Sequence, residues 1–178
     1  MSESNPERTI VVIETTAGAI TVEIDEAAAP ITATNFLDYV DAGAYDGGRF
    51  HRTVTMRNQP DNAVKIEVIQ AGPNAAHPLV DGAVIPLERT SVTGLRHLGG
   101  TISMGRDSPD SALSEIFFCI GDQPELDFGG RRNPDGQGFA AFGRALAGHD
   151  VIRAIQQSPH DGQTLTPAIA IQRIARNR

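Results

Sequence analysis

The sequence predicts a mainly β protein, a closed antiparallel barrel with one helix covering each end. Short β-branched runs, broken by Gly and Pro, occupy most of the chain. Only two segments, near residues 30–42 and 147–157, show the apolar spacing of a helix. Closure of the sheet removes strand edges and leaves two apolar openings, which two well-separated helices can cover.

The N-terminal elements are a β-hairpin and the first helix. Residues 9–15 and 19–24 are β-rich runs, and the three residues between them predict a tight turn. Pro30 suits the first turn of a helix, where its missing N–H costs nothing. Gly43 ends this helix. Its buried stripe is Ala33, Phe36, Leu37 and Val40.

The rest of the chain is predicted as short strands up to a second helix over about residues 148–157. That helix buries Val151, Ile152 and Ile155. A last strand covers residues 168–174, and the glycine-rich run 129–138 predicts a loop. Residues 1–8 are interpreted as a flexible lead-in, which leaves one domain over residues 9–178.

Composition narrows the function classes. The formal net charge of −7 argues against a nucleic-acid partner, which usually meets a basic patch. There is no run of about 18 apolar residues, so we expect no membrane span. The single cysteine, Cys119, lies in an apolar run and indicates a buried thiol in a reducing compartment. We therefore expect a cytoplasmic protein, or a periplasmic one if a leader preceded this sequence.

Metal, phosphate and nucleophile sites find little support. The five histidines are scattered without ligand spacing, and the glycine-rich stretches lack the lysine of a phosphate loop. No serine stands in a nucleophile elbow. We expect neither a metal nor another cofactor.

Three short motifs carry the functional prediction, and they follow one another as Phe50-His51-Arg52, Ile69-Gln70-Ala71-Gly72 and Gly100-Thr101-Ile102-Ser103-Met104. In this order and in a β-rich setting they resemble the cyclophilin family of peptidyl-prolyl isomerases, over about residues 9–175. The resemblance implies a closed eight-stranded antiparallel barrel. It also implies an enzyme that turns X–Pro bonds in proline-containing peptides or unfolded proteins, and we expect a monomer.

Arg52 is the catalytic residue that the resemblance implies. A guanidinium that donates to the prolyl nitrogen binds only the twisted amide, in which that nitrogen regains its lone pair, and so lowers the barrier. Without the resemblance, a strand arginine in a surface ion pair is the simpler interpretation. The implied substrate-binding residues are Phe50, Gln70, Gly105, Arg106, Glu115, Phe117, Leu126 and Phe139.

Several departures from the family pattern leave alternatives open. Glu67 and Glu115 place acids where an apolar wall and a glutamine are expected, which keeps a catalytically weak or inactive peptide- or protein-binding module on the same barrel as the alternative function. Either the wall near Glu67 is open, or the longer loop 53–66 supplies Val64 or Ile66 instead.

Two further points stay open at this level. Phe117 and Phe118 compete for the pocket floor, since neighbouring strand residues face opposite sides; we favour Phe117. Glu125 and the lack of tryptophan predict weak or no cyclosporin binding.

Overall fold

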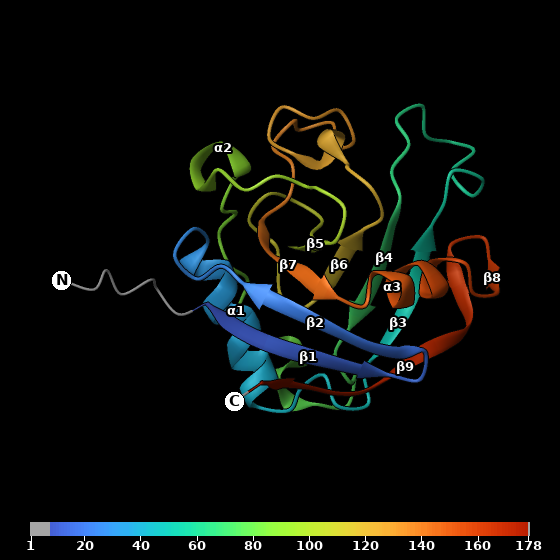
Figure 1. The fold of residues 1–178 in the computed structure, drawn as a ribbon. Helices are drawn as coiled ribbons and strands as arrows, with labels where there is room; N and C mark the ends of the chain where they lie inside the picture. Colours follow the sequence, from blue (N-terminus) through green and yellow to red (C-terminus); the bar gives the residue numbers. More distant parts are fainter. Residues whose placement is uncertain (1–7, 178) are drawn as a thin grey trace.

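The computed structural model describes residues 8–177, and eight of the nine strands in that part of the chain form one closed antiparallel barrel (Figure 1). Around the barrel the strands follow the order β1, β2, β7, β5, β6, β4, β3 and β9, and β9 pairs again with β1. Their bounds are β1 Thr9–Thr15, β2 Gly18–Ile24, β3 Arg49–Val54, β4 Val68–Gly72, β5 Thr101–Met104, β6 Ile116–Cys119, β7 Ala141–Ala147 and β9 Thr164–Arg176. The predicted barrel is confirmed. The flexible lead-in predicted for residues 1–8 lies outside the described residues, apart from Arg8.

One helix lies at each of two opposite sides of the barrel, as predicted. Figure 1 shows α1 (Pro30–Asp41) at the left of the barrel and α3 (His149–Gln156) at the right. Both contribute buried side chains to the main core, with Phe36 of α1 and Ile155 of α3 fully buried. Pro30 stands in the first turn of α1, and Gly43 follows its C-cap with a φ of 69°, a left-handed conformation that glycine adopts without strain.

Smaller elements complete the chain. A one-turn helix, α2 (Thr90–Thr93), and two 3₁₀ turns at Pro78–Asp81 and Pro124–Leu126 lie in the long connections. The short strand β8 (His160–Asp161) pairs only with β9, which is longer than the predicted 168–174. Among residues 8–177, no helix has the length and apolar character needed to cross a membrane.

Alternation along the strands buries side chains on both faces of one part of the sheet. On β6, Ile116 and Phe118 point into the barrel core, whereas Phe117 and Cys119 point outward. The outward residues join a second group, here called the outer apolar cluster. It consists of Val54, Ile66, Val68, Phe117, Cys119 and Leu126, with Phe139 packed against it.

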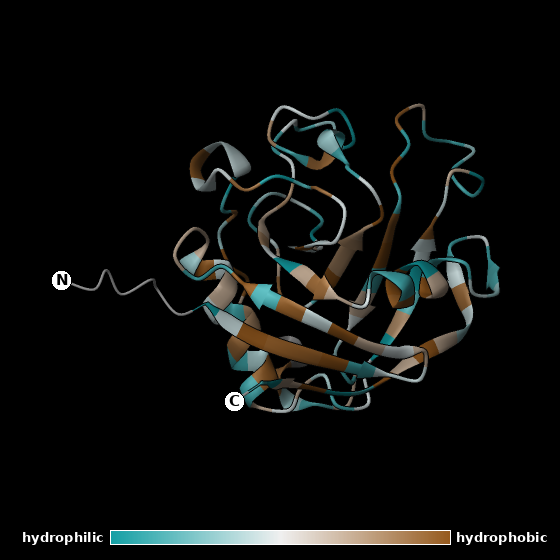
Figure 2. Ribbon diagram, in the orientation of Figure 1, coloured by the Kyte–Doolittle hydropathy of each residue, from teal (hydrophilic) through white to brown (hydrophobic). Residues whose placement is uncertain are grey.

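Residues outside the strands complete the outer apolar cluster: Ile66 lies before β4, and Leu126 and Phe139 lie between β6 and β7. In Figure 2 the strands carry most of the strongly hydrophobic stretches, whereas the rim loops are largely pale or hydrophilic. Burial in the cluster raises the pKa of the Cys119 thiol well above its usual range. The cluster forms the base of the site described next.

Candidate active site

A pocket of about 550 Å³ opens on the outer face of β3, β4 and β6. It combines an apolar floor with a polar rim. Its lining residues are Arg52, Ile66, Val68, Gln70, Gly105, Arg106, Asp107, Ser111, Leu113, Glu115, Phe117, Leu126 and Phe139. Seven of the eight substrate-binding residues expected from the sequence, and the expected catalytic Arg52, are among them.

The sheet register aligns the central residues of this pocket. Arg52 on β3 is the cross-strand partner of Gln70 on β4, and Gln70 is the partner of Phe117 on β6. Phe117 is in turn the partner of Ser103 on β5. Because direct partners share one face of a sheet, these four side chains form one row across the outside of the barrel.

A bulge at His51 places Arg52 on this outer face and Phe50 on the other. The register shifts between Phe50, which pairs with Ala71, and Arg52, which pairs with Gln70. Residues two apart normally face the same side, but an extra residue reverses that relation. Phe50 therefore lies fully buried in the barrel core against Phe118, with 6.4 Å between ring centroids. Its expected role as a substrate-binding residue is wrong.

Arg52 is held by two glutamines. Its Nη1 donates to Gln70 Oε1 over 2.9 Å, and its Nε donates to Gln163 Oε1 over 3.0 Å. Burial lowers the pKa of Arg52, while the nearby charge of Glu115 acts in the opposite direction. A guanidinium titrates so far above neutrality that it stays charged. The Nη2 group has no hydrogen-bond partner among residues 8–177 and keeps both of its N–H donors.

The floor is the outward ring of Phe117, which settles the open choice against Phe118. Phe118 is fully buried inside the barrel, whereas Phe117 lines the pocket in edge-to-face contact with Phe139, at 5.3 Å between centroids. Leu126 stands beside them. Phe139 is fixed next to Leu126 by a backbone hydrogen bond of 3.0 Å. Gly138 permits this approach, since a Cβ there would lie 2.5 Å from the Leu126 carbonyl oxygen and its φ is 69°.

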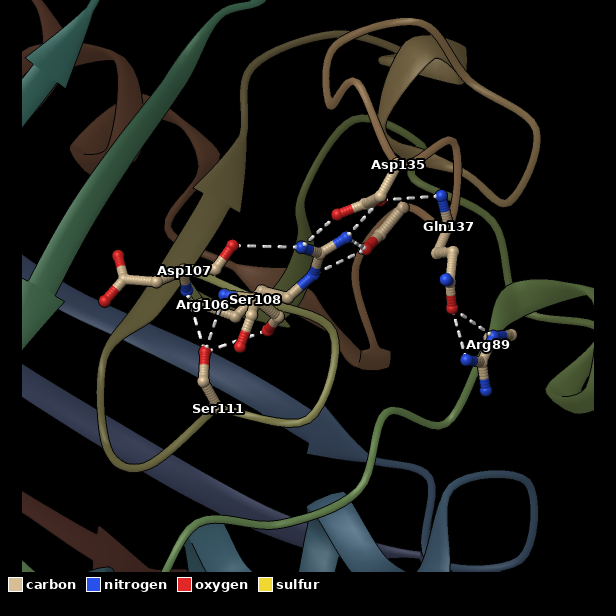
Figure 3. Close-up of polar contacts among 8 residues, drawn as sticks. Arg89, Arg106, Asp107, Ser108, Ser111, Asp135 and Gln137 are labelled. Atoms are coloured by element: carbon tan, nitrogen blue, oxygen red, sulfur yellow. Dashed lines mark hydrogen bonds and ion pairs between the residues drawn. The ribbon is translucent and has the colours of Figure 1, made fainter.

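Gly105 and Arg106 form one side of the pocket mouth. The Arg106 side chain is 1% exposed and makes a bidentate ion pair with Asp135, over 2.9 and 3.0 Å (Figure 3). Its Nε also donates to the Gly138 carbonyl, and its guanidinium lies 5.0 Å from the centre of the Phe139 ring. Hydrogen bonding from Arg106 holds the pKa of Asp135 below its usual value. The Arg106 side chain thus fastens the 129–138 loop to the pocket.

Glu115 lies at the rim, where it pairs with His51. Its Oε1 is 2.9 Å from His51 Nε2, and its side chain is 40% exposed. Its Oε2 is buried and has no hydrogen-bond partner among the described residues. Gly72 makes room for this oxygen, since a Cβ at that position would lie only 2.6 Å away. The carboxylate therefore acts on Arg52 through space rather than by direct contact.

Glu67 does not face the pocket, so the expectation that it interrupts the apolar wall is wrong. Its Oε2 accepts a hydrogen bond of 2.8 Å from Gln156 Nε2, at the end of α3. The wall is built instead by Val68 and by Ile66. Ile66 was one of the two substitutes named from the sequence, so the longer loop does supply part of the wall.

One arginine, Arg132, links the longer loop 53–66 to the 129–138 loop. Gln59, which is 1% exposed, bonds to Ile66 through both its amide N–H and its carbonyl groups. Arg132 Nη1, from the 129–138 loop, donates to Gln59 Oε1 over 2.8 Å and to the Val64 carbonyl over 2.7 Å. Burial lowers the pKa of Arg132, and the like charge of Arg52 lowers it further. Arg132 and its two acceptors therefore connect the two loops beside Arg52.

Sequence reasoning did not identify Gln163 or His51 as parts of this site. Gln163 reaches Arg52 from the turn before β9, far away along the chain, and no local motif marks it. His51 was visible next to Arg52, but its partner Glu115 is 64 residues away. Among residues 8–177, no three or more His, Cys, Asp or Glu side chains are arranged to hold a metal ion.

Comparisons with known proteins agree with this geometry. Residues 10–176 match the family described as cyclophilin type peptidyl-prolyl cis-trans isomerase/CLD. The chain is 35% identical over 150 residues to peptidyl-prolyl cis-trans isomerase A of Dickeya dadantii, covering 84% of this chain and 72% of that protein. It is 34% identical over 145 residues to peptidyl-prolyl cis-trans isomerase cyp18 of Streptomyces antibioticus, covering 81% of each.

Solved structures give the same fold. A Cryptosporidium parvum cyclophilin type peptidyl-prolyl cis-trans isomerase superposes with a TM-score of 0.78 at 19% identity, covering 97% of this chain and 99% of that one. A structure of that protein in the presence of the dipeptide Ala-Pro gives a TM-score of 0.76 at 20% identity, covering 95% and 99%. The relatives are named as isomerases, so a catalytically weak or inactive binding module is not the favoured function.

Proposed function

Since the chain belongs to the cyclophilin-type peptidyl-prolyl cis-trans isomerase family, and is an enzyme that turns X–Pro bonds, we propose that Arg52 and the pocket above Phe117 carry out this rotation. One observation carries the assignment. A guanidinium whose Nη2 keeps both of its N–H donors is held at the edge of an apolar pocket large enough for a proline ring.

The reaction makes and breaks no covalent bond. Rotation about an X–Pro amide crosses a barrier of roughly 20 kcal/mol, which resonance of the amide sets. In the twisted state the prolyl nitrogen regains a lone pair that accepts a hydrogen bond. Arg52 Nη2 is the donor for that lone pair, and this contact exists only in the twisted state. It therefore lowers the barrier instead of merely tightening binding.

The pocket walls hold the proline ring while the amide turns. Phe117, Leu126 and Phe139 enclose the ring from below and from the side, and Ile66 and Val68 close the remaining apolar edge. The peptide on the other side of the proline lies beside Gly105 and Arg106, where β5 has ended. Gln70 holds Arg52 and presents its own amide to the substrate carbonyl.

Charge at the rim adds a substrate preference. Two acidic residues, Asp107 and Glu115, line the pocket, and the Glu115 side chain is 40% exposed at its rim. A substrate with a basic residue near the proline gains an attraction there that a neutral residue does not provide. The enzyme therefore favours basic sequences around proline.

Two further parts of the proposal concern partners. The protein acts as a monomer, which size-exclusion chromatography with light scattering tests. It binds cyclosporin weakly or not at all, because the chain has no tryptophan and Glu125 is paired with Arg131 over 2.6 Å. Titration calorimetry with cyclosporin tests that part.

The direct test of the function is exchange spectroscopy on a short Ala-Pro peptide. The purified protein should speed the interconversion of the cis and trans forms in proportion to its concentration. A rate equal to that of the peptide alone would overturn the proposed function.

A further inference from the structure

Three polar side chains form a hydrogen-bonded chain directly beneath the pocket floor. His97 Nδ1 lies 2.7 Å from Asp127 Oδ1, and His97 Nε2 lies 2.8 Å from Ser103 Oγ. The backbone N–H of His97 also donates to Asp127 Oδ1 over 2.9 Å. His97 and Ser103 are 1% and 0% exposed. No step of the proposed mechanism uses this chain of contacts.

The contact with Asp127 fixes the donor at one ring nitrogen of His97. A carboxylate only accepts, so Nδ1 of His97 donates to Asp127. Nε2 is hydrogen-bonded to the Ser103 hydroxyl, so both ring nitrogens of His97 have partners. Burial alone would raise the pKa of Asp127, but its hydrogen bonds with His97 outweigh burial and lower it. The imidazole is therefore held at both ring nitrogens and at its own backbone.

The order Ser, His and Asp is also that of a hydrolase triad, but the burial excludes that use. Ser103 lies in the middle of β5 with no exposed surface, and the Phe117 ring lies over the imidazole. A nucleophile needs access to its substrate. The three hydrogen-bonded side chains therefore support the pocket floor and do not contact the substrate.

Each of these three side chains contacts, pairs with or directly follows a residue that lines the pocket. The His97 ring is stacked on the Phe117 ring, with 5.9 Å between centroids and 10° between planes. Ser103 is the direct cross-strand partner of Phe117. Asp127 directly follows Leu126, the side wall.

We propose that His97 is the positioning residue of the proline pocket, fixing the plane of the Phe117 floor and, through Asp127, the position of the Leu126 wall. This inference rests on the proposed isomerase function. The prolyl nitrogen must lie within hydrogen-bond distance of Arg52 while the ring sits on the floor. A small displacement of the floor therefore lowers the rate without abolishing binding.

The test uses His97→Gln, which removes the stacked ring, and Ser103→Ala, which removes only the contact at Nε2. Thr32→Val is the matched control. Thr32 is fully buried on α1 and its hydroxyl donates to Glu88 over 2.7 Å, so the control loses a partly buried hydrogen bond away from the pocket. All rates are divided by the folded fraction measured by circular dichroism.

For His97→Gln we expect kcat per folded molecule to fall about tenfold, whereas the dissociation constant of an Ala-Pro peptide changes roughly twofold or less. For Ser103→Ala we expect a kcat loss of about threefold. Resonances of the Phe117 ring and the Leu126 methyl groups should shift in both variants and stay unchanged in Thr32→Val. A structural role alone would lower the folded fraction and leave these corrected values unchanged.

The inference and the function fail in different ways. If the wild type does not catalyse exchange, the proposed function is wrong. If the wild type is active, and Ser103→Ala and His97→Gln keep wild-type kcat and wild-type Phe117 resonances, the positioning role of His97 is overturned. Should His97→Gln not fold, Ser103→Ala decides alone by the same two measurements.

Discussion

Arg52 and Gln70 stand directly opposite each other on β3 and β4, and the 2.9 Å hydrogen bond between them follows from that register. A contact made by cross-strand partners needs no loop to adopt a special conformation. The guanidinium is therefore oriented before substrate arrives, and little conformational entropy is lost when the twisted amide forms.

The first prediction concerns Arg52 itself. Arg52→Ala should lower kcat/KM on an X–Pro peptide at least about tenfold, which corresponds to about 1.4 kcal/mol of lost transition-state stabilisation. Thermal stability should change little, because the loss of two hydrogen bonds is offset by removal of a like charge next to Arg132. Arg52→Lys should recover little activity, since an ammonium lacks the planar group that bonds both glutamines. Wild-type turnover in the alanine variant would exclude Arg52 from the mechanism.

The second prediction concerns Gln163, which only the structure reveals. Gln163→Ala should lower kcat/KM by roughly threefold to tenfold, because Arg52 Nε loses its acceptor while Nη1 keeps Gln70. Gln172→Ala on the exposed side of β9 is the matched control and should retain full activity. The double variant Arg52→Ala/Gln163→Ala should be no slower than Arg52→Ala, since both changes remove the same function. Additive losses would show that Gln163 acts independently of Arg52.

The third prediction concerns charge in the groove. The wild type should turn over peptides with lysine before proline faster than those with alanine, and those with glutamate most slowly. Glu115→Gln should raise kcat/KM on the alanine peptide and reduce this preference. Glu67→Gln is the matched control. The Glu67 carboxylate accepts a hydrogen bond from Gln156 away from the pocket, so removing its charge should leave the preference for lysine before proline unchanged. Equal rates of the wild-type enzyme on all three peptides would contradict the role assigned to Glu115.

The fourth prediction concerns acid stability. The pKa of Asp127 is lowered in the folded protein, so the folded state binds fewer protons there than the unfolded chain. The contribution of Asp127 to stability is therefore complete above the ordinary carboxyl pKa, about 3.9, and is lost as pH falls through the lower folded value. Urea unfolding between about pH 5 and pH 2.5 should show a shallower pH dependence for Asp127→Asn than for wild type. Parallel curves would mean that Asp127 has the same pKa in both states.

Local patterns in the sequence were enough for the hairpin, both helices and the closed barrel, since alternation, Pro30 and Gly43 act over short ranges. Arg52, Gln70 and Phe117 were found because they stand in recognisable motifs. Phe50 was misplaced because a bulge at His51 reverses the faces of β3, and nothing in the sequence marks that bulge. Glu67 was misplaced although the signal was present: it is an odd number of residues from Gln70 and so faces the other side. Gln163 and His97 depend on partners brought together only by the fold.

The guanidinium of Arg132 couples the 129–138 loop to the segment around Gln59 and Val64, so we expect the two segments to change together among relatives. If the segment around Gln59 and Val64 were shortened, Arg132 would lose both acceptors and remain half-buried beside a second cation. An unpaired, partly desolvated charge is among the costlier defects a protein can carry. A relative with the shorter segment is therefore expected to have a neutral residue at this position. Transfer of the longer segment to another barrel should succeed only when the 129–138 loop is transferred with it.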